Sequence, residues 1–442
     1  MLLPFPTAAQ AGAIAGLLMA SSLLFAPISP AVAQDSALVD ALVRKGILSS
    51  GEAENITSDL VREYQTTGGG KIELANHVRH LSIYGDARLR YQWDQQKAQA
   101  GGAVSPSNKT RVRLCLGGEY TFSDQWSAGV QLLTATVNDS ANQNIGAGYG
   151  KFGINVGLLY LNWRPADWLS LTAGRQRNPF YTTDLVWDGD ICLEGLVQVA
   201  AWKPGDSLSL TLTTGQLYFA DNPENAAVGN VDVWQFVEQA RLDWQVAPHV
   251  TVTLAPGVST MTGGSTLGIN TSAVRYLTAS GADNLNLLLF PGEVRYDGGT
   301  LPLKFYWDFA YNTAGARRVQ QTFAVAPSQR GLDDSIAWLI GVKAGRARKK
   351  GDWSVDVNFR TLGLSSVDSN LSDGDFAAGN LNQQGIKVSG QYRFTDSVTG
   401  GINLFSTWSY KDDPDVAALG NAGGIVSINS QQLVEFDLQW KF

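Results

Sequence analysis

The sequence predicts an all-β transmembrane barrel of about 16 antiparallel strands, preceded by a short α-helical segment. Segments of roughly 9–14 residues alternate apolar and polar side chains with the period of two that a strand requires. The gaps between these segments alternate between short and long along the chain. Beyond the amino-terminal run, no stretch holds the ~20 apolar residues of a membrane helix, so any crossing is expected to use strands.

Residues 1–33 are predicted to be a signal peptide. Ile14 to Phe25 form an apolar run, and the small residues Ala31-Val32-Ala33 follow as a cleavage site before Gln34. No Lys or Arg precedes the run, which departs from the usual pattern. An amino-terminal membrane anchor is the alternative, but the run is short and two prolines follow it.

Residues 34–77 are predicted to form a periplasmic helical segment and linker. Ser36 to Lys45 has helical spacing and stops at a glycine, and a second helix is expected from about Ser50 to Tyr64. Two short helices cannot bury a core of their own. The segment is either a spacer or assembly aid, or a docking or oligomerisation element. The barrel is expected over residues 78–442.

The gaps between the expected strands indicate a membrane barrel. Seven short gaps consist of turn-forming residues such as Ser123-Asp124 and Pro204-Gly205. The long gaps hold about 13 to 23 residues rich in Gly, Asn, Ser and Asp. Compact soluble domains rarely carry so many long loops, whereas short turns at one end and long loops at the other suit a barrel. The expected strands are 81–93, 109–122, 125–137, 151–164, 168–176, 195–203, 206–217, 231–246, 249–260, 284–296, 301–313, 335–348, 351–362, 383–395, 397–409 and 431–442.

The tryptophans are distributed as two aromatic belts, one near the short turns and one near the long loops, as expected at the two membrane interfaces. Glu238 does not fit this pattern, because it falls on the apolar face of strand 231–246, where a charge is costly. The two belts comprise Trp126, Trp163, Trp168, Trp244, Trp353 and Trp440, and Trp93, Trp234, Trp338 and Trp408.

Composition argues against several other classes of protein. The formal net charge of -7 makes nucleic acid an unsuitable partner. The three histidines are His77, His80 and His249, and none lies where a Ser–His catalytic pair is evident. We therefore predict no enzyme, no cofactor and no metal site, and interpret His77 and His80 as exposed residues.

The third long loop carries motifs of a known family. It resembles the "putative porin" family of Gram-negative outer membranes, as do Ser372 to Phe376 and Gly351 to Trp353; Ile191-Cys192 departs from the Asn-Pro that members often carry. The resemblance implies an exported outer-membrane homotrimer surrounded by outer-membrane lipid, whose water-filled channel passes small hydrophilic solutes and ions. The motif comprises Gly174-Arg175, Asn178-Pro179-Phe180, Thr183-Asp184-Leu185-Val186-Trp187-Asp188, Asp190 and Glu194-Gly195.

The resemblance also implies that this third loop folds into the lumen and narrows it. An acidic loop opposite a basic wall would set up a transverse field that sorts solutes by charge and dipole. Alternatively, the loop carboxylates only cap turns and hold the loop's shape. The candidate residues are Arg177, Asp184, Asp188, Asp190 and Glu194 in the loop, and Arg88, Arg90, Arg111 and Arg113 on the expected lumen face of the first two strands.

Two cysteines and the last residue give further expectations. Cys115 shares the face of Arg111 and Arg113, and Cys192 lies in the third loop. In an oxidising periplasm they could form a disulfide or remain free thiols. Phe442 resembles the signal that the barrel-assembly machinery reads, and it should lie on the lipid side of the last strand, against the first.

A general diffusion channel is the favoured interpretation. Neither an aromatic ladder for sugars nor an unbroken arginine track for phosphate is evident. Inward-pointing Trp202, Tyr306 and Phe405 would keep a carbohydrate route open. The alternatives are a substrate-selective channel for carbohydrates or anions, and a structural or adhesive outer-membrane barrel.

Overall fold

The computed structural model describes residues 79–98, 104–135, 140–146, 148–220, 232–262, 285–316, 332–411 and 428–442, together with Val43, Lys45 and Ala53. The predicted signal peptide and all but these three residues of the helical segment 34–77 lie outside the described residues. In the part that is described, no helix is long and apolar enough to span a membrane.

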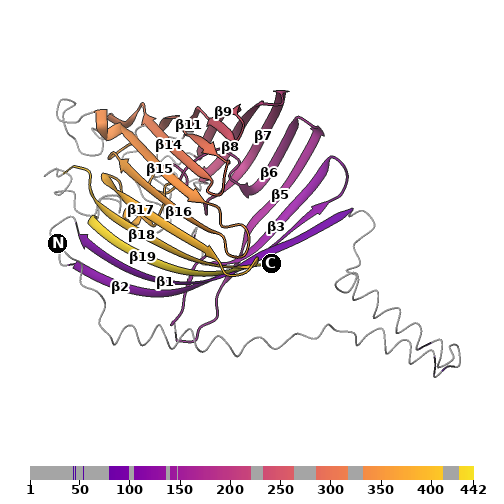
Figure 1. The fold of residues 1–442 in the computed structure, drawn as a ribbon, viewed down its shortest axis with the longest axis horizontal. Coiled ribbons are helices and arrows are strands. Elements are labelled where there is room, and N and C mark those ends of the chain that lie inside the picture. Colours follow the sequence, from indigo (N-terminus) through magenta and orange to yellow (C-terminus); the bar gives the residue numbers. More distant parts are fainter. Residues whose placement is uncertain are drawn as a thin grey trace, which may run out of the picture. The chain divides into compact units, whose positions relative to one another are not determined.

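The strands form one closed antiparallel sheet in which β1 pairs with β2 on one side and with β19 on the other (Figure 1). The barrel has sixteen strands, as predicted. The strands are β1 (His80–Ala98), β2 (Val104–Thr121), β3 (Trp126–Thr134), β4 (Gln143–Asn144), β5 (Ile154–Ala166), β6 (Leu169–Arg177), β7 (Cys192–Gly205), β8 (Leu208–Ala220), β9 (Val233–Ala247), β10 (Val250–Leu254), β11 (Gly257–Thr262), β12 (Asn286–Leu289), β13 (Gly292–Tyr296), β14 (Leu303–Asn312), β15 (Ile336–Gly345), β16 (Trp353–Leu362), β17 (Gln383–Arg393), β18 (Val398–Ser409) and β19 (Ile428–Lys441).

Two barrel strands are each divided in two by a proline. β10 and β11 flank Pro256, and β12 and β13 flank Pro291. Proline has no N–H to donate to the sheet, so the pairing is interrupted at both places. The two breaks lie side by side, since the Ala255 N–H donates to the Pro291 carbonyl at 2.9 Å. β4 is an additional two-residue strand that the sequence did not predict.

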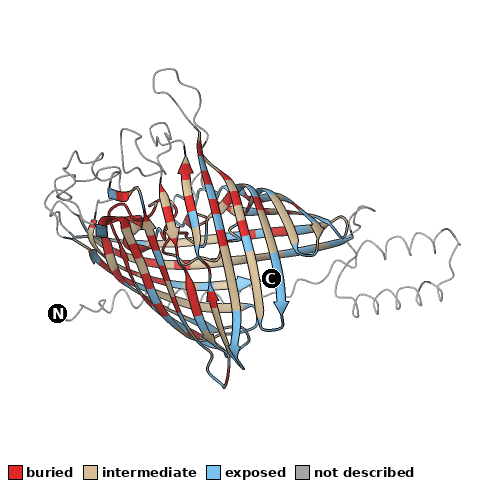
Figure 2. Ribbon diagram, turned by 90° about the horizontal axis from the view of Figure 1, so that it is seen from above, coloured by how far each residue is buried: buried red, intermediate tan, exposed pale blue. Residues whose placement is uncertain are grey.

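The faces of the strands follow the predicted alternation, which Figure 2 shows as alternating buried and exposed residues. In β16, Trp353 and Val355 are exposed on the outer face, whereas Ser354 and Arg360 are buried. Outward apolar residues suit lipid, and inward polar residues suit a lumen. Glu238 shares the exposed face of Trp234 and Phe236, as predicted.

One of the three aromatic residues considered for the lumen lies elsewhere. Trp202 is exposed on the outer face and stacks on Trp168, with the ring centroids 6.0 Å apart. Trp202 is six residues after Leu196 in β7, and an even separation puts both side chains on the same outward face. Tyr306 and Phe405 are buried on the lumen side.

The last residue closes the barrel against β1. The Phe442 N–H donates to the Gly85 carbonyl at 3.1 Å, and the Gly85 N–H donates back at 3.0 Å. The Phe442 ring lies directly over Gly85, where an added Cβ would be 2.5 Å from the ring. The same Cβ would lie 2.6 Å from the backbone carbonyl oxygen of Cys115, which is held in the sheet, so this position favours glycine.

The apolar core lies inside the barrel. Two segments between strands supply much of it: residues 178–191, between β6 and β7, and residues 363–382, between β16 and β17. We call these the first and second lumen loops. Their buried residues pack on inward side chains of the wall such as Val197, Leu217 and Leu339.

Candidate channel constriction

The first lumen loop is held in place by apolar residues. Leu185, Val186 and Trp187 are almost fully buried, and the rings of Phe180 and Trp187 stack with centroids 5.9 Å apart. Burying side chains of this size removes several hundred Å² from water, at roughly 25 cal/mol per Å². The apolar half of the motif therefore drives the loop inward.

Polar contacts fix the course of this loop across the lumen. The Tyr181 backbone exchanges two hydrogen bonds with the Gln239 amide of β9, at 2.7 and 2.8 Å. The Tyr181 hydroxyl donates to Glu293 of β13 at 2.8 Å, and the Thr183 hydroxyl donates to Asp308 of β14 at 2.8 Å. Burial and the Glu293 carboxylate raise the pKa of Tyr181, so this hydroxyl stays a donor.

The second lumen loop meets the first. The Asp188 N–H donates to the Leu371 carbonyl at 2.6 Å, and the Asp373 N–H donates to the Asp184 carbonyl at 3.3 Å. The Gly374 N–H donates to the Asp188 carboxylate at 3.2 Å. Sequence reasoning noted Ser372 to Phe376 only as a family resemblance and gave it no role.

Charged residues from both loops and from the wall surround a cavity of about 190 Å³. Five of the nine predicted site residues line it. Four further charged residues, none of them among the predicted site residues, also line it, from the second loop, β17 and β19. The lining residues are Arg88, Arg90, Asp184, Asp188, Gly189, Asp190, Asp373, Asp375, Lys387, Asn403, Phe405 and Glu435.

Two wall arginines are neutralised by carboxylates. Arg90 forms ion pairs with Glu435, with Asp437 at 2.7 Å and with Asp375 at 3.3 Å. Arg113 pairs with Asp86 at 2.8 Å and lies 3.7 Å from Asp190 of the first lumen loop. The charge of Arg90 is therefore largely neutralised by these three carboxylates of the protein.

The other two wall arginines have only amide partners. Arg88 donates to Asn142 at 2.8 Å, and Arg111 donates to Asn144 at 3.1 Å. Among the described residues, no carboxylate forms an ion pair with either. Arg88 lines the cavity, whereas Arg111 is not part of its lining.

The carboxylates where the loops meet differ in proton affinity. Burial and the neighbouring Asp373 raise the pKa of Asp188 to about 7, and Asp190 acts in the same direction. Burial alone would raise the pKa of Asp373 too, but the charges of Lys387 and Arg360 hold it below its ordinary value. Asp373 is therefore a fixed anion, whereas Asp188 titrates near neutral pH.

Comparison with known proteins decides the family. The sequence profile of the family described as "Putative porin" matches residues 95–262 and 296–437, which is more than half of the chain. This chain belongs to the putative porin family. It is a porin-type β-barrel of the bacterial outer membrane, a channel class rather than an enzyme class.

Other comparisons add little to this assignment. The porin resembles a solved structure described as Salmonella typhi OmpF in complex with daunomycin, at 12% identity and a TM-score of 0.49. That match covers 84% of this chain and 100% of the other. No curated protein matches the porin.

Arg177, Glu194 and the two cysteines of the porin are not part of the cavity lining. Arg177 ends β6 with its guanidinium 5.9 Å from the ring centre of Tyr84. Glu194 lies in β7 rather than in the loop and forms an ion pair with Arg175. Cys115 and Cys192 are both free in this structure.

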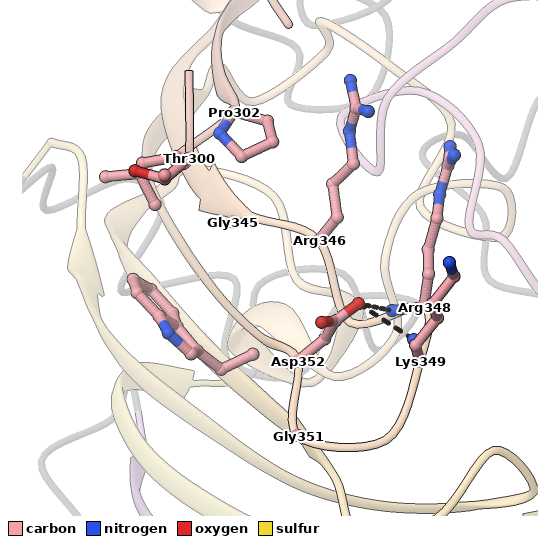
Figure 3. Close-up of a pocket in the computed structure, with 10 residues that line it drawn as sticks. Thr300, Pro302, Gly345, Arg346, Arg348, Lys349, Gly351 and Asp352 are labelled. Atoms are coloured by element: carbon pink, nitrogen blue, oxygen red, sulfur yellow. Dashed lines mark hydrogen bonds between the residues drawn. The ribbon is translucent and has the colours of Figure 1, made fainter. Parts of the chain in front are cut away.

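A larger hollow of about 640 Å³ lies between two short turns of the porin (Figure 3). Its lining includes Arg346, Arg348 and Lys349, and the Asp352 carboxylate accepts the backbone N–H groups of Arg348 and Lys349. These bonds shape the turn. Unlike the smaller cavity, this hollow contains no residue from either lumen loop, and its size does not make it the functional site.

Proposed function

We propose that this porin is a water-filled channel for passive diffusion of small hydrophilic solutes and ions, narrowed by the first lumen loop. The observation that supports this is the charged cavity, where Asp188 and Asp190 of the loop and Arg88 of the wall line the same space. A barrel of this strand number has room for water in its lumen. The loops reduce that room to a passage lined by charge.

The charges in the cavity favour small cations over anions. Six carboxylates and three cationic side chains line it. Several of these are paired, as with Arg90 and Glu435, so the preference is expected to be mild. Acidic residues in a narrow pore concentrate cations, and basic residues on the opposite wall orient dipolar solutes.

The decisive experiment is planar-bilayer recording of the refolded porin, before and after deletion of Thr183 to Asp190. We expect a clear increase in single-channel conductance and a reversal potential closer to zero, because the deletion removes three carboxylates and the bulk of Trp187. An unchanged conductance would contradict the role of the loop. Absence of both conductance and liposome swelling with sugars would favour a structural or adhesive barrel instead.

We also propose a route of export and assembly. Residues 1–33 would direct export, residues 34–77 would remain periplasmic, and Phe442 would be read by the barrel-assembly machinery before homotrimers form in outer-membrane lipid. The position of Phe442 on the seam with β1 supports its part in closure. Mass spectrometry of the exported protein should give Gln34 as the first residue. Deletion of Phe442 should lower the amount in the outer membrane.

A further inference from the structure

The second lumen loop is as deeply buried as the first. Leu364, Val367, Leu371 and Phe376 are all nearly inaccessible to solvent, and Phe376 begins a short 3-10 helix, η4 (Phe376–Gly379). The Ala378 N–H donates to the Gln431 side chain of β19 at 3.1 Å. The loop therefore enters the lumen and is fastened to the wall on the side of β19.

Asp373 is the point where this loop, the wall and the first lumen loop are joined. Its carboxylate accepts the Arg360 guanidinium of β16 at 2.9 Å and the Lys387 ammonium of β17 at 3.2 Å. Both cations also reach Asp184 of the first loop. Lys387 binds its carboxylate at 2.7 Å, and Arg360 donates to its backbone carbonyl at 3.2 Å.

The pairing is buried and specific. Arg360 is 1% exposed, its guanidinium lies 4.3 Å from the ring centre of Phe376, and Asp373 is 7% exposed. Buried ion pairs add little net stability, because desolvation offsets the attraction, but removing one partner leaves an uncompensated charge. This cluster of buried charges is therefore suited to holding the two lumen loops in one arrangement.

Both loops carry the same short pattern, and in each loop both aspartates of the pattern line the cavity. Asp188-Gly189-Asp190 belongs to the first loop and Asp373-Gly374-Asp375 to the second. Gly189 and Gly374 are exposed, and a Cβ added at either glycine would meet nothing within 4 Å. The two loops thus form adjoining parts of one lining.

We propose that residues 363–382 are a second constriction loop and that Asp373 is the positioning residue that holds the first loop in the passage. Asp375 adds its carboxylate to the lining. This inference rests on the proposed channel function and adds a second constriction element to it. The pore size then depends on a contact between two loops that are about 180 residues apart in the sequence.

Cysteine modification tests whether the second loop lines the passage. In a Cys115→Ser, Cys192→Ser background, Gly374→Cys and Gly189→Cys would each be treated with a charged methanethiosulfonate during bilayer recording. We expect modification at either position to lower conductance roughly twofold, because added bulk narrows the passage. A response at Gly189→Cys without one at Gly374→Cys would overturn the inference and leave the channel function intact. Absence of any conductance before modification would instead refute the channel function.

Asp373→Asn tests the positioning role. We expect higher mean conductance with more current noise, and a reversal potential shifted toward anions, since Arg360 loses its carboxylate partner and Lys387 keeps only Asp184. Asp373→Glu should restore part of the original noise level. Asp297→Asn is the matched control, because it removes ion pairs with Arg346 and Arg295 at the short-turn end and contacts neither loop directly. Wild-type conductance, noise and reversal potential in a folded Asp373→Asn barrel would overturn the role.

Discussion

The outer face of the barrel and its lumen differ in the kind of contact that determines their structure. Outside, the large exposed side chains are mostly aliphatic or aromatic, and their positions follow from the alternation of each strand. Inside, two loops from distant parts of the chain meet through named contacts, such as the bond from Gly374 to Asp188. The outer face therefore determines where the protein resides, and the lumen determines what passes through it.

Replacing a buried tryptophan in the lumen should have the largest effect on conductance. Trp187 is 2% exposed and stacks on Phe180. Trp187→Ala would cost about 3–5 kcal/mol of local packing, as large-to-small substitutions in a core do. We expect the first lumen loop to detach and single-channel conductance to rise severalfold, while the strands stay paired.

The matched control for Trp187→Ala is Trp163→Ala. Trp163 is exposed on the outer face and stacks on Trp126, with centroids 5.5 Å apart. Its loss should leave conductance unchanged. If the two variants altered conductance equally, the distinction between the two faces would be wrong.

This contrast explains what the sequence could and could not predict. The strands and their outward residues follow from alternation, since period two is a local property of the chain. Pro256 and Pro291 interrupt two strands that were expected to be continuous. Because a proline has no N–H to donate, both interruptions also follow from a local property of the chain. The sequence motif also singled out Asp184, Asp188 and Asp190, which line one cavity together with Arg88 and Arg90 of β1.

The second lumen loop was missed because nothing local marks a loop as inward. Its apolar residues, such as Leu364 and Phe376, show no strand or helix periodicity, and their burial depends on which wall they meet. Glu194 was assigned to the loop because the motif includes it, yet pairing with Arg175 makes it part of β7. The roles of Asp373 and Lys387 depend on contacts between segments far apart in sequence.

Two neighbouring arginines should behave differently when neutralised. Arg90→Gln would leave Glu435, which is 1% exposed, without its main cation, at a cost of about 3–5 kcal/mol. We expect a lower unfolding temperature. Arg88→Gln together with Arg111→Gln removes charges that have no carboxylate partner among the described residues. We expect that double variant to shift the reversal potential toward cations with little change in stability.

Arg113→Gln provides the intermediate case, because Arg113 has both a wall partner, Asp86, and a loop neighbour, Asp190. It should show a smaller shift in reversal potential and a modest loss of stability. Reversal potentials that stay at the wild-type value in all of these variants would contradict a transverse field in the cavity.

Glu238 is the exception on the outer face, and removing it should have a smaller effect. It lies opposite Thr214 and Val258 on the neighbouring strands, between outward apolar residues. Glu238→Leu should raise stability by about 1–2 kcal/mol, since a carboxylate facing lipid is unfavourable. Denaturant unfolding in lipid vesicles measures this. A loss of stability would contradict this reasoning, and an oligomer on native gels that Glu238→Leu dissociates would indicate that Glu238 contacts another protein chain.

The smallest effect expected is a dependence of selectivity on pH. The pKa of Asp188 is raised to about 7, so its carboxyl is mostly neutral at pH 6 and ionised at pH 8. Cation preference should therefore increase across this range. Because the raised pKa favours the protonated form in the folded loop, the contact between the two loops should weaken as pH rises from about 4 through 7.

Asp188→Asn tests whether this carboxyl, rather than another charged group of the cavity, causes the dependence of selectivity on pH. The variant keeps a side chain of similar size but cannot ionise, so its reversal potential should stay constant between pH 6 and 8. Any remaining change of reversal potential with pH would come from the other charged residues around the cavity, namely Arg88, Arg90, Lys387, Asp184, Asp190, Asp373, Asp375 and Glu435. An undiminished slope in Asp188→Asn would mean that another of these groups titrates near neutral pH, and that the meeting point of the two loops is not where the channel senses protons.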